Sequence, residues 1–237
     1  MSITIDPIDA YLAFKEEFPC FFQVRTRRLV TDPRYMRAYR QQHGVALGLL
    51  DRNPWVAYLV DLVESMGPGE EKQVFPYLRV INLKETQDSV GVVVVGIIAK
   101  TRGQDAERLV LIHQERHATG KLHWEVPRGF GEPGIDSTAN ALKELAEETG
   151  FQGKDAIFLG CAYPDSGLTN ACVHFYWVPI LEESRVAWEA QEVITEQKLV
   201  TVEEFWHMVV DGRMQDGFSI QAVALYERFK TRQNGPL

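Results

Sequence analysis

The sequence has few cysteines, no long apolar run and no excess of positive charge. Its 237 residues include three cysteines, which are widely spaced and form no Cys-x-x-Cys pair. Such usage argues against a disulfide framework and favours reduced, mostly buried thiols in a cytosolic protein. The longest apolar run, Val90–Ala99, is far too short to span a bilayer. The N-terminus lacks the basic start and apolar core of a signal peptide, so we expect a cytoplasmic protein without a membrane partner.

The charge balance is acidic. The chain has 25 Lys and Arg residues against 33 Asp and Glu residues, which gives a formal net charge of -8 at pH 7. We therefore expect no nucleic-acid partner, because a protein that binds the phosphate backbone needs a basic surface. A small anionic ligand is still compatible with this charge, since a bound metal ion reverses the local field.

The first third of the chain is predicted to be helical. Pro7–Phe18 suits a short helix, and Asp32-Pro33 resembles an N-cap followed by proline in the first turn. Asn53-Pro54 repeats this pattern before an apolar stripe over Trp55–Met66. We expect a helical N-terminal extension over residues 1–75. Its apolar stripes need a partner, either the main domain or a second subunit, and a homodimer is the expected state.

The rest of the chain, residues 76–237, is expected to form one α+β domain with a mixed sheet. Val90–Lys100 has no polar face, so it should be a central strand buried on both sides. Thr201 and Glu204 form a capping-box pattern at the start of a helix. The expected strands are 75–83, 90–100, 108–114, 123–126, 156–163, 172–180 and 197–200, and the expected helices are 136–150, 201–211 and 219–230.

Three carboxylates share one face of the helix that ends at Gly150. Glu144, Glu147 and Glu148 are spaced i, i+3 and i+4, and like charges at that spacing destabilise a helix unless a cation offsets them. Mg²⁺ prefers such oxygen ligands. A glycine-rich turn, residues 127–134, precedes the helix. Taken alone, the triplet is more often a solvated helix face, because Glu favours helices.

The whole stretch from Gly129 to Phe151, which we refer to as the box, resembles the signature of the Nudix hydrolases. That signature runs Gly, five residues, Glu, seven residues, then Arg-Glu-apolar-any-Glu-Glu-any-Gly-apolar. Ile135 replaces its first Glu, and Lys143 replaces its Arg. The positions that match are Gly129, Glu144, Leu145, Glu147, Glu148, Gly150 and Phe151. The resemblance implies a Nudix-type α/β/α sandwich and a divalent metal cofactor, Mg²⁺, with Mn²⁺ as an alternative.

The segments that flank the box are similar to those of ADP-ribose and nucleotide-sugar pyrophosphatases. They are residues 111–116 and 124–129 upstream and Tyr163-Pro-Asp-Ser-Gly-Leu-Thr-Asn170 downstream. The resemblance implies Mg²⁺-dependent hydrolysis of the pyrophosphate bond in a small nucleoside diphosphate derivative, such as ADP-ribose or a nucleotide sugar. Ser166 stands where the subfamily has a proline associated with ADP-ribose use. A second hypothesis is therefore a catalytically weak Nudix domain that binds a nucleotide as a sensor or partner module.

The resemblance also implies roles for individual residues. Metal ligands would be Glu144, Glu147 and Glu148, with the backbone carbonyl of Arg128 or Gly129 completing the shell. Glu144 and Glu148 would be catalytic, and the general base would come from the late acidic loop, residues 182–196. The candidates for that base are Glu189 and Glu192, either of which is more simply explained as a solvated side chain.

Four further residues are candidates for substrate binding. Arg116 could contact a phosphate oxygen, although a surface salt bridge explains it equally well. Glu125 could act in the site or pair with a nearby arginine. Phe130 and Tyr163 flank the proposed site and could stack on a base.

Two charged residues could compensate for the altered box positions. Asp136 is adjacent to Ile135 and could partly replace the missing carboxylate. Lys143 keeps the positive charge of the arginine that it replaces, and could pair with a box glutamate.

Overall fold

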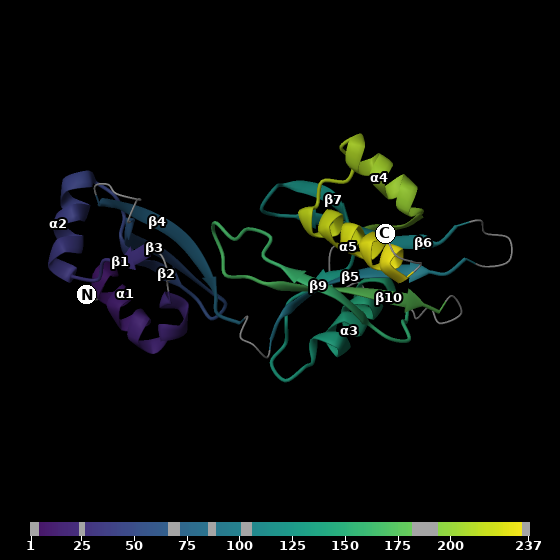
Figure 1. The fold of residues 1–237 in the computed structure, drawn as a ribbon, viewed down its shortest axis with the longest axis horizontal. Coiled ribbons are helices and arrows are strands. Elements are labelled where there is room, and N and C mark those ends of the chain that lie inside the picture. Colours follow the sequence, from purple (N-terminus) through teal and green to yellow (C-terminus); the bar gives the residue numbers. More distant parts are fainter. Residues whose placement is uncertain are drawn as a thin grey trace. The chain divides into compact units, whose positions relative to one another are not determined.

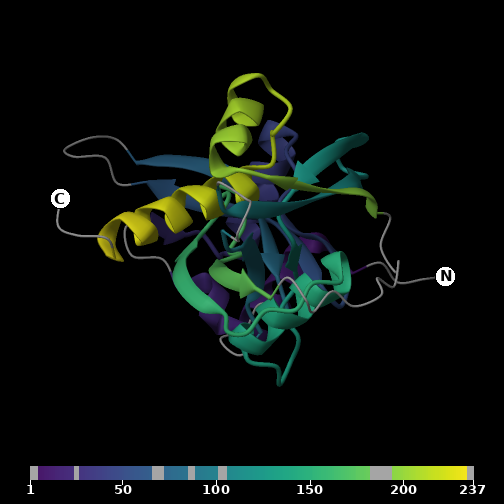
Figure 2. The ribbon, with the colours of Figure 1, turned by 90° about the vertical axis from the view of Figure 1, so that its right-hand side faces the viewer.

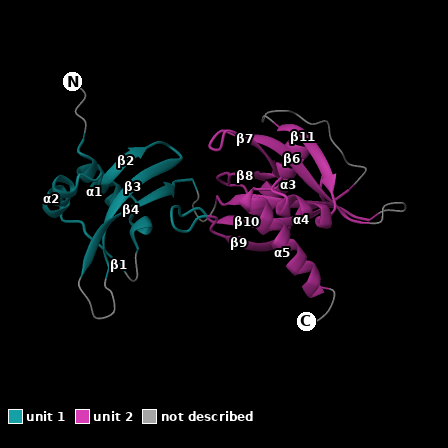
Figure 3. Cartoon of the chain, turned by 90° about the horizontal axis from the view of Figure 1, so that it is seen from above, with its two compact units in different colours: residues 1–84, 165–171 teal, residues 85–164, 172–237 magenta. Residues whose placement is uncertain are grey.

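The chain folds into two compact units (Figures 1 and 3). The computed structural model describes residues 5–23, 27–65, 72–84, 89–100, 106–181 and 194–233. The first unit comprises residues 1–84 and 165–171, and the second comprises residues 85–164 and 172–237. The boundary expected from the sequence, after residue 75, falls inside strand β4 (Gln73–Asn82) of the first unit.

Two of the three helices expected in the first unit are confirmed. Helix α1 (Pro7–Glu17) is capped by Asp6, and helix α2 (Pro33–His43) is capped by Asp32; each has proline in its first turn. The short 3₁₀ helix η1 (Pro19–Phe22) follows α1. The N-cap and proline patterns therefore locate both helix starts.

The third expected helix, over Trp55–Met66, is wrong: strand β3 (Val56–Ser65) occupies this stretch. It pairs antiparallel with β4 on one edge and with β1 (Arg27–Leu29) and β2 (Gly48–Arg52) on the other. The Asn53 side chain accepts hydrogen bonds from the backbone N–H groups of Trp55 and Val56 at 2.8 and 2.9 Å, so Asn53-Pro54 forms a turn. The short apolar run before Asp61 and around Leu62 and Val63 fits a buried strand as well as a helical stripe. The N-terminal part is consequently an α+β unit with an antiparallel sheet, and the prediction of a helical extension is wrong.

A buried ionic cluster joins the elements of the first unit. Asp61 on β3 accepts a hydrogen bond of 2.6 Å from the Tyr11 hydroxyl on α1. It also pairs with Arg79 on β4, whose Nη1 donates to the Phe21 carbonyl at 2.5 Å. One carboxylate thus fixes α1, η1 and two strands together.

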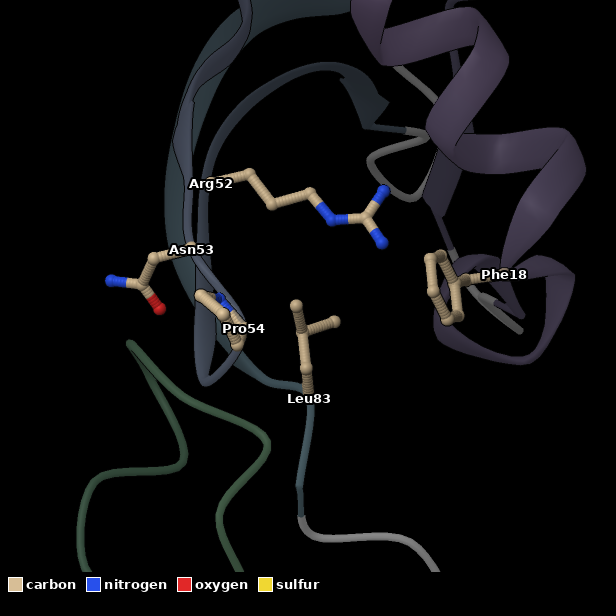
Figure 4. Close-up of a pocket in the computed structure, with 5 residues that line it drawn as sticks. All are labelled: Phe18, Arg52, Asn53, Pro54 and Leu83. Atoms are coloured by element: carbon tan, nitrogen blue, oxygen red, sulfur yellow. The ribbon is translucent and has the colours of Figure 1, made fainter.

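The first unit also contains a hollow of about 480 Å³ (Figure 4). It is lined by Phe18, Arg52, Asn53, Pro54 and Leu83. In Figure 4 the Arg52 guanidinium points toward the Phe18 ring, and its centre lies 5.0 Å from the ring centroid. Glu17 accepts two hydrogen bonds from this guanidinium, at 2.7 and 2.9 Å, so the positive charge in the hollow is already matched.

The second unit is built on a seven-stranded mixed sheet. Its main order is β11 (Ile194–Val200), β6 (Arg108–Arg116), β5 (Gly91–Ile98), β10 (Val173–Ile180) and β9 (Ile157–Ala162). Strand β7 (Lys121–Glu125) pairs with β6, and β8 (Arg128–Gly129) pairs with β5. Strands β5 and β10 are parallel, and the other described pairs in this sheet are antiparallel.

Helices cover both faces of this sheet (Figures 1 and 2). Helix α3 (Ser137–Thr149) lies on one face, and α4 (Val202–Val210) and α5 (Gly217–Gln233) lie on the other. Every residue of β5 is buried, and alternate side chains enter two separate cores, one under α3 and one under α4 and α5. The α/β/α sandwich and the central buried strand are therefore confirmed.

The sheet geometry brings the segment before the box onto β5. The described pairing of β5 with β6 covers two residue pairs, Ile97–Leu109 and Ile98–Arg108. Toward the start of β5, Val92 and Val93 pair instead with Gly129 and Arg128 of β8. The first residue of the box, Gly129, therefore lies beside the central strand β5, and the chain then leads into α3.

The three cysteines are less buried than the sequence suggests. Cys20 and Cys161 are exposed and Cys172 is partly buried, so the prediction of mostly buried thiols is wrong. Cys161 lies on β9, which ends the main strand order of the sheet.

Among the described residues, no helix is both long enough and apolar enough to cross a bilayer.

Candidate functional site

Helix α3 places two of its carboxylates against the strand that precedes it. Asp136 caps this helix, and Gly150 ends it with a positive φ of 71°. Glu144 lies so close to Gly129 that a Cβ on this glycine would be 2.1 Å from the Glu144 Cδ. One turn later, Glu148 is buried and its Oε2 accepts a hydrogen bond of 2.9 Å from the Arg128 backbone N–H. Glu144 and Glu148 therefore converge on the backbone of residues 128–129.

The third box carboxylate does not join them. The Glu147 side chain is 58% exposed and accepts a hydrogen bond of 2.9 Å from Lys143. Within the part of the chain that the structure describes, no three His, Cys, Asp or Glu side chains are close enough together to hold a metal ion. The structure brings together Glu144, Glu148, Arg128 and Gly129 from the predicted ligand set, and it leaves Glu147 at the surface.

The donors that converge here fit a hard divalent cation. Mg²⁺ is usually bound by one or two carboxylates and keeps several water ligands, rather than being enclosed by protein groups. Glu144 and Glu148 supply two carboxylates, and the missing side chain of Gly129 leaves room for the Glu144 carboxylate against the backbone. Two carboxylates that converge on one stretch of backbone thus suit Mg²⁺ or Mn²⁺.

Beside these carboxylates lies a buried cluster of Arg116, Glu125 and Arg128. Glu125 is fully buried and accepts hydrogen bonds from Arg116 Nε at 2.8 Å, Arg116 Nη2 at 2.5 Å and Arg128 Nε at 3.1 Å. Burial alone would raise the pKa of Glu125, but the hydrogen bond from Arg116 and the charges of both guanidinium groups hold it below its usual value. Asp216 adds a second carboxylate 3.7 Å from Arg128, so the two guanidinium charges are matched by two carboxylates.

The pairing of Glu125 with arginine is thus the arrangement observed. The Arg116 side chain remains 30% exposed while it binds a fully buried carboxylate. Burial lowers the pKa of Arg116, and the bond to Glu125 together with the charges of Glu125 and Glu148 more than offsets this. Arg116 is therefore a charged group held in one orientation, unlike a loose surface salt bridge.

Three residues at the start of α5 complete the site and were not singled out from the sequence. The Arg128 guanidinium lies 4.5 Å from the Phe218 ring centroid and 3.7 Å from Asp216. The Ser219 hydroxyl, which is buried, accepts a hydrogen bond of 2.9 Å from the Val126 backbone N–H. Asp216 has the position of a helix cap, which is a visible sequence signal, but its contact with a residue 88 positions earlier is not.

The remaining candidates are placed as follows. Phe130 is 75% exposed, and its carbonyl accepts a hydrogen bond of 2.9 Å from the buried Asn140 amide. Tyr163 is 58% exposed after the end of β9, and no described contact joins it to the α3 carboxylates. Glu189 and Glu192, the candidates for the general base, lie outside the described residues.

Asp136 and Lys143 are both engaged. The Asp136 carboxylate accepts hydrogen bonds from the backbone N–H groups of Thr138 and Ala139, at 3.1 and 3.3 Å, so it serves as the helix cap. Lys143 donates to Glu132 at 2.8 Å and to Glu147 at 2.9 Å. Lys143 therefore pairs with a box glutamate, and a second glutamate in the turn binds it as well.

A mixed sheet between helical layers, with a carboxylate-bearing helix packed on a glycine strand, defines the fold class. The NUDIX domain family model matches residues 90–219, which is more than half of the chain. The chain belongs to the Nudix family.

Two known proteins that are similar to this chain are named as pyrophosphatases of ADP derivatives. An ADP-sugar pyrophosphatase of Mus musculus is 30% identical over 133 residues, which are 56% of this chain and 58% of the mouse protein. An ADP-ribose pyrophosphatase of Bacillus subtilis (strain 168) is 27% identical over 144 residues, which are 58% of this chain and 77% of the bacterial protein. The chain thus matches little more than half the length of the mouse relative.

A solved structure supports the fold of the chain. The crystal structure of an ADP compounds hydrolase has a TM-score of 0.60 and 16% identity. The match covers 89% of this chain and 97% of that one. The similarity therefore extends beyond the residues that the family model matches.

Proposed function

We propose that the protein hydrolyses the pyrophosphate bond of a nucleoside diphosphate derivative, such as ADP-ribose or a nucleotide sugar, with Mg²⁺ as its metal. The observation that carries this proposal is the convergence of Glu144 and Glu148 on the backbone of residues 128–129, near the partly exposed guanidinium of Arg116 that Glu125 holds in place. The names of the mouse and bacterial relatives support the same substrate class.

The proposed roles follow from the geometry. Glu144, Glu148 and the carbonyl of Arg128 or Gly129 would hold the metal. When bound, this metal neutralises charge on the phosphate oxygens and lowers the pKa of a water ligand. The hydrogen bond from the Arg128 N–H fixes one oxygen of Glu148, so the carboxylate keeps its orientation. Arg116 would bind a phosphate oxygen through the part of its planar guanidinium that Glu125 leaves exposed.

For two roles, stacking on the nucleobase and accepting the proton of the attacking water, two residues each are candidates. Phe130, which is 75% exposed next to Gly129, would stack on the base, with Tyr163 as the second candidate. Glu189 or Glu192 would accept the proton of the attacking water, as the resemblance implies.

We further propose a cytoplasmic homodimer. Light scattering at micromolar concentration would refute the dimer if it gave the mass of a monomer, 27.0 kDa.

A substrate panel tests the proposal. The purified protein would be incubated with Mg²⁺ and ADP-ribose, nucleotide sugars or dinucleotides, and products would be separated by anion exchange. We expect a nucleoside monophosphate and a phosphorylated second product. Glu148→Gln should reduce the rate by at least about 10²-fold, because it removes a metal ligand. Absence of turnover for every compound, with Glu148→Gln indistinguishable from the wild type, would exclude the activity.

A second candidate function is nucleotide binding without efficient turnover. It is favoured by Ile135, since the box lacks one carboxylate and the adjacent Asp136 is committed to capping α3. Calorimetry with ADP-ribose and Mg²⁺ would show binding in the absence of product. If Ile135→Glu markedly raised the rate, the box of this chain would have drifted from a more active form.

A further inference from the structure

Lys143 connects helix α3 to the glycine-rich turn before it. Its ammonium nitrogen lies 2.8 Å from Glu132 Oε1, 2.9 Å from Glu147 Oε2 and 4.0 Å from Glu144 Oε1. Glu132 comes from the turn, and the other two carboxylates come from the helix. One positive charge therefore bridges two segments and offsets part of the repulsion between the helical carboxylates.

Lys143 stands at one of the two places where the box departs from the Nudix signature, and Ile135, three residues after Glu132, stands at the other. The signature has Glu at 135 and Arg at 143, whereas this chain has Ile135 and Lys143. The backbone N–H of Ile135 donates to the Glu132 carbonyl at 3.1 Å within the turn, and Asp136 is used as the cap. The acidic side chain of the turn that reaches residue 143 is thus Glu132, three positions before the place where the signature has its first Glu.

The chemistry of lysine suits this arrangement. An ammonium carries three donors on a compact charge and can bind two separate carboxylates, whereas a guanidinium favours a planar, bidentate pair with one. Glu132 and Glu147 are separate carboxylates at nearly equal distance from Lys143. The change from Arg to Lys and the shift of the acid from 135 to 132 are therefore consistent with one another.

The turn is also fixed at a second point, on the sheet. A Cβ on Gly131 would lie 2.3 Å from the Ser89 carbonyl carbon, so the turn packs tightly against the backbone just before β5. Glu132 follows directly and is bound to α3 through Lys143. Gly129, at the start of the same turn, carries the backbone against which Glu144 rests.

We propose that the Glu132–Lys143 pair positions the turn on α3 in this chain, in place of a carboxylate at 135. Lys143 also restrains Glu147 at the surface, which leaves Glu144 and Glu148 as the metal-binding pair. Glu132 and Lys143 are positioning residues, since they act through the placement of Gly129 and Glu144. The inference rests on the proposed function in that it assumes a metal at these carboxylates.

The test is the dissociation constant of Mn²⁺ alone, measured by electron paramagnetic resonance on the full chain. Glu132→Gln and Lys143→Met should each weaken Mn²⁺ binding by about tenfold, as the loss of a residue that orients metal ligands does. The double variant should be no weaker than Lys143→Met alone, because that substitution already removes the contact with Glu132. Adding Ile135→Glu and Lys143→Arg to Glu132→Gln should restore most of the affinity.

Lys230→Met is the matched control. Lys230 pairs with Glu107 at 2.8 Å with side-chain exposures of 33% and 34%, close to the 35% of Lys143 and 45% of Glu132. This variant should leave Mn²⁺ affinity unchanged. An unchanged affinity in Glu132→Gln, or an equal loss in Lys230→Met, overturns the proposal.

A second readout separates this proposal from the proposed function. Hydrogen exchange at the amides of residues 130–132 and 134 should be faster in Glu132→Gln than in the wild type, with or without metal. Unchanged exchange in the metal-free protein counts against the positioning role. Absence of turnover in a wild type that binds Mn²⁺ and shows these differences would overturn the proposed activity alone.

Discussion

Gly129 shows how a single residue determines the geometry of the site. A side chain at this position would overlap the Glu144 carboxylate, whose oxygens lie 2.3 Å from the ideal Cβ. Real Cβ atoms do not approach so closely, so either Glu144 or the strand must move. The absence of a side chain is therefore as much a part of the candidate site as the carboxylate itself.

Gly129→Ala should lower the turnover rate by about 10²-fold, since displacing a catalytic group by about 1 Å can have an effect of that size. Steady-state kinetics with Mg²⁺ would measure it. Gly217→Ala is the control, because nothing lies within 4 Å of a Cβ there and the backbone φ is ordinary. Equal activity in both variants would mean that Glu144 does not need its observed position.

Glu125 contributes to stability in a way that depends on pH. Its folded pKa lies below the usual 4.5, so the ionised carboxylate stabilises the fold fully above that pH. The contribution is lost as the pH falls through the folded pKa. Removing the charge leaves the partly buried guanidinium groups of Arg116 and Arg128 without the carboxylate that pairs with both, which is costly.

Glu125→Gln should therefore lower the free energy of unfolding by about 3–5 kcal/mol at pH 7. The difference from the wild type should stay constant down to about pH 5 and shrink at lower pH, because the wild type loses its charge there. Urea unfolding at several pH values would measure this. A difference that grows as the pH falls would contradict the assignment.

At the scale of elements, the start of α5 contacts the segment that runs from the end of β7 into β8. Ser219 accepts the hydrogen bond of the buried Val126 N–H, and Phe218 lies against the Arg128 guanidinium. The start of a C-terminal helix thus supports the segment that leads into the box. Such support explains why a residue 71 positions after Glu148 can affect the site.

Ser219→Ala should lower the free energy of unfolding by about 1–3 kcal/mol, because it leaves a buried backbone donor without its acceptor. It should also reduce turnover, since Val126 precedes Arg128 by two residues. Thr231→Ala in the same helix removes an exposed hydrogen bond to the Glu227 carbonyl and should have little effect on either quantity. Chemical denaturation and kinetics of both variants provide the comparison, and equal effects would refute this role of Ser219.

Local signals predicted elements well where they were unambiguous. The apolar run of β5, the caps of α3 at Asp136 and Gly150, and the capping box of α4 all appear in the structure. The prediction for Trp55–Met66 failed because its short apolar runs, which Asp61 and Glu64 interrupt, fit a buried strand as well as a helical stripe. Strand pairing on both edges, which no local pattern encodes, determined the outcome.

The candidate site was predictable only in its local part. Glu144 and Glu148 follow from the spacing within one helix, and the position of Gly129 follows from the signature. The contacts of Arg128 with Asp216 and of Val126 with Ser219 join residues about 90 positions apart. The Glu132–Lys143 pair was missed because Glu132 lies three residues from the position where the signature places its acid.

At the scale of the whole molecule, the two units have separate cores. Residues of α1, α2 and β3 form one core, and the sheet of the second unit is covered by two others. The candidate metal ligands belong to the second unit alone. A ligand that binds one folded unit stabilises that unit by mass action.

Mg²⁺ at 100 times its dissociation constant should accordingly stabilise the second unit by about 2.7 kcal/mol. Differential scanning calorimetry should show this as a higher unfolding temperature for that unit. Tyr11→Phe, which weakens the Asp61 cluster, should lower the transition of the first unit and so identify it. Glu148→Gln should abolish the effect of Mg²⁺. An equal shift of both transitions would contradict independent units.

The central claim is that Glu144 and Glu148, but not Glu147, form the metal-dependent hydrolytic site. The most direct test is the turnover of ADP-ribose or a nucleotide sugar with Mg²⁺ by Glu144→Gln, Glu147→Gln and Glu148→Gln. We expect losses of at least about 10²-fold for Glu144→Gln and Glu148→Gln, and less than about tenfold for Glu147→Gln, whose side chain is exposed and bound to Lys143. Equal losses in all three variants, or the largest loss in Glu147→Gln, would contradict this claim.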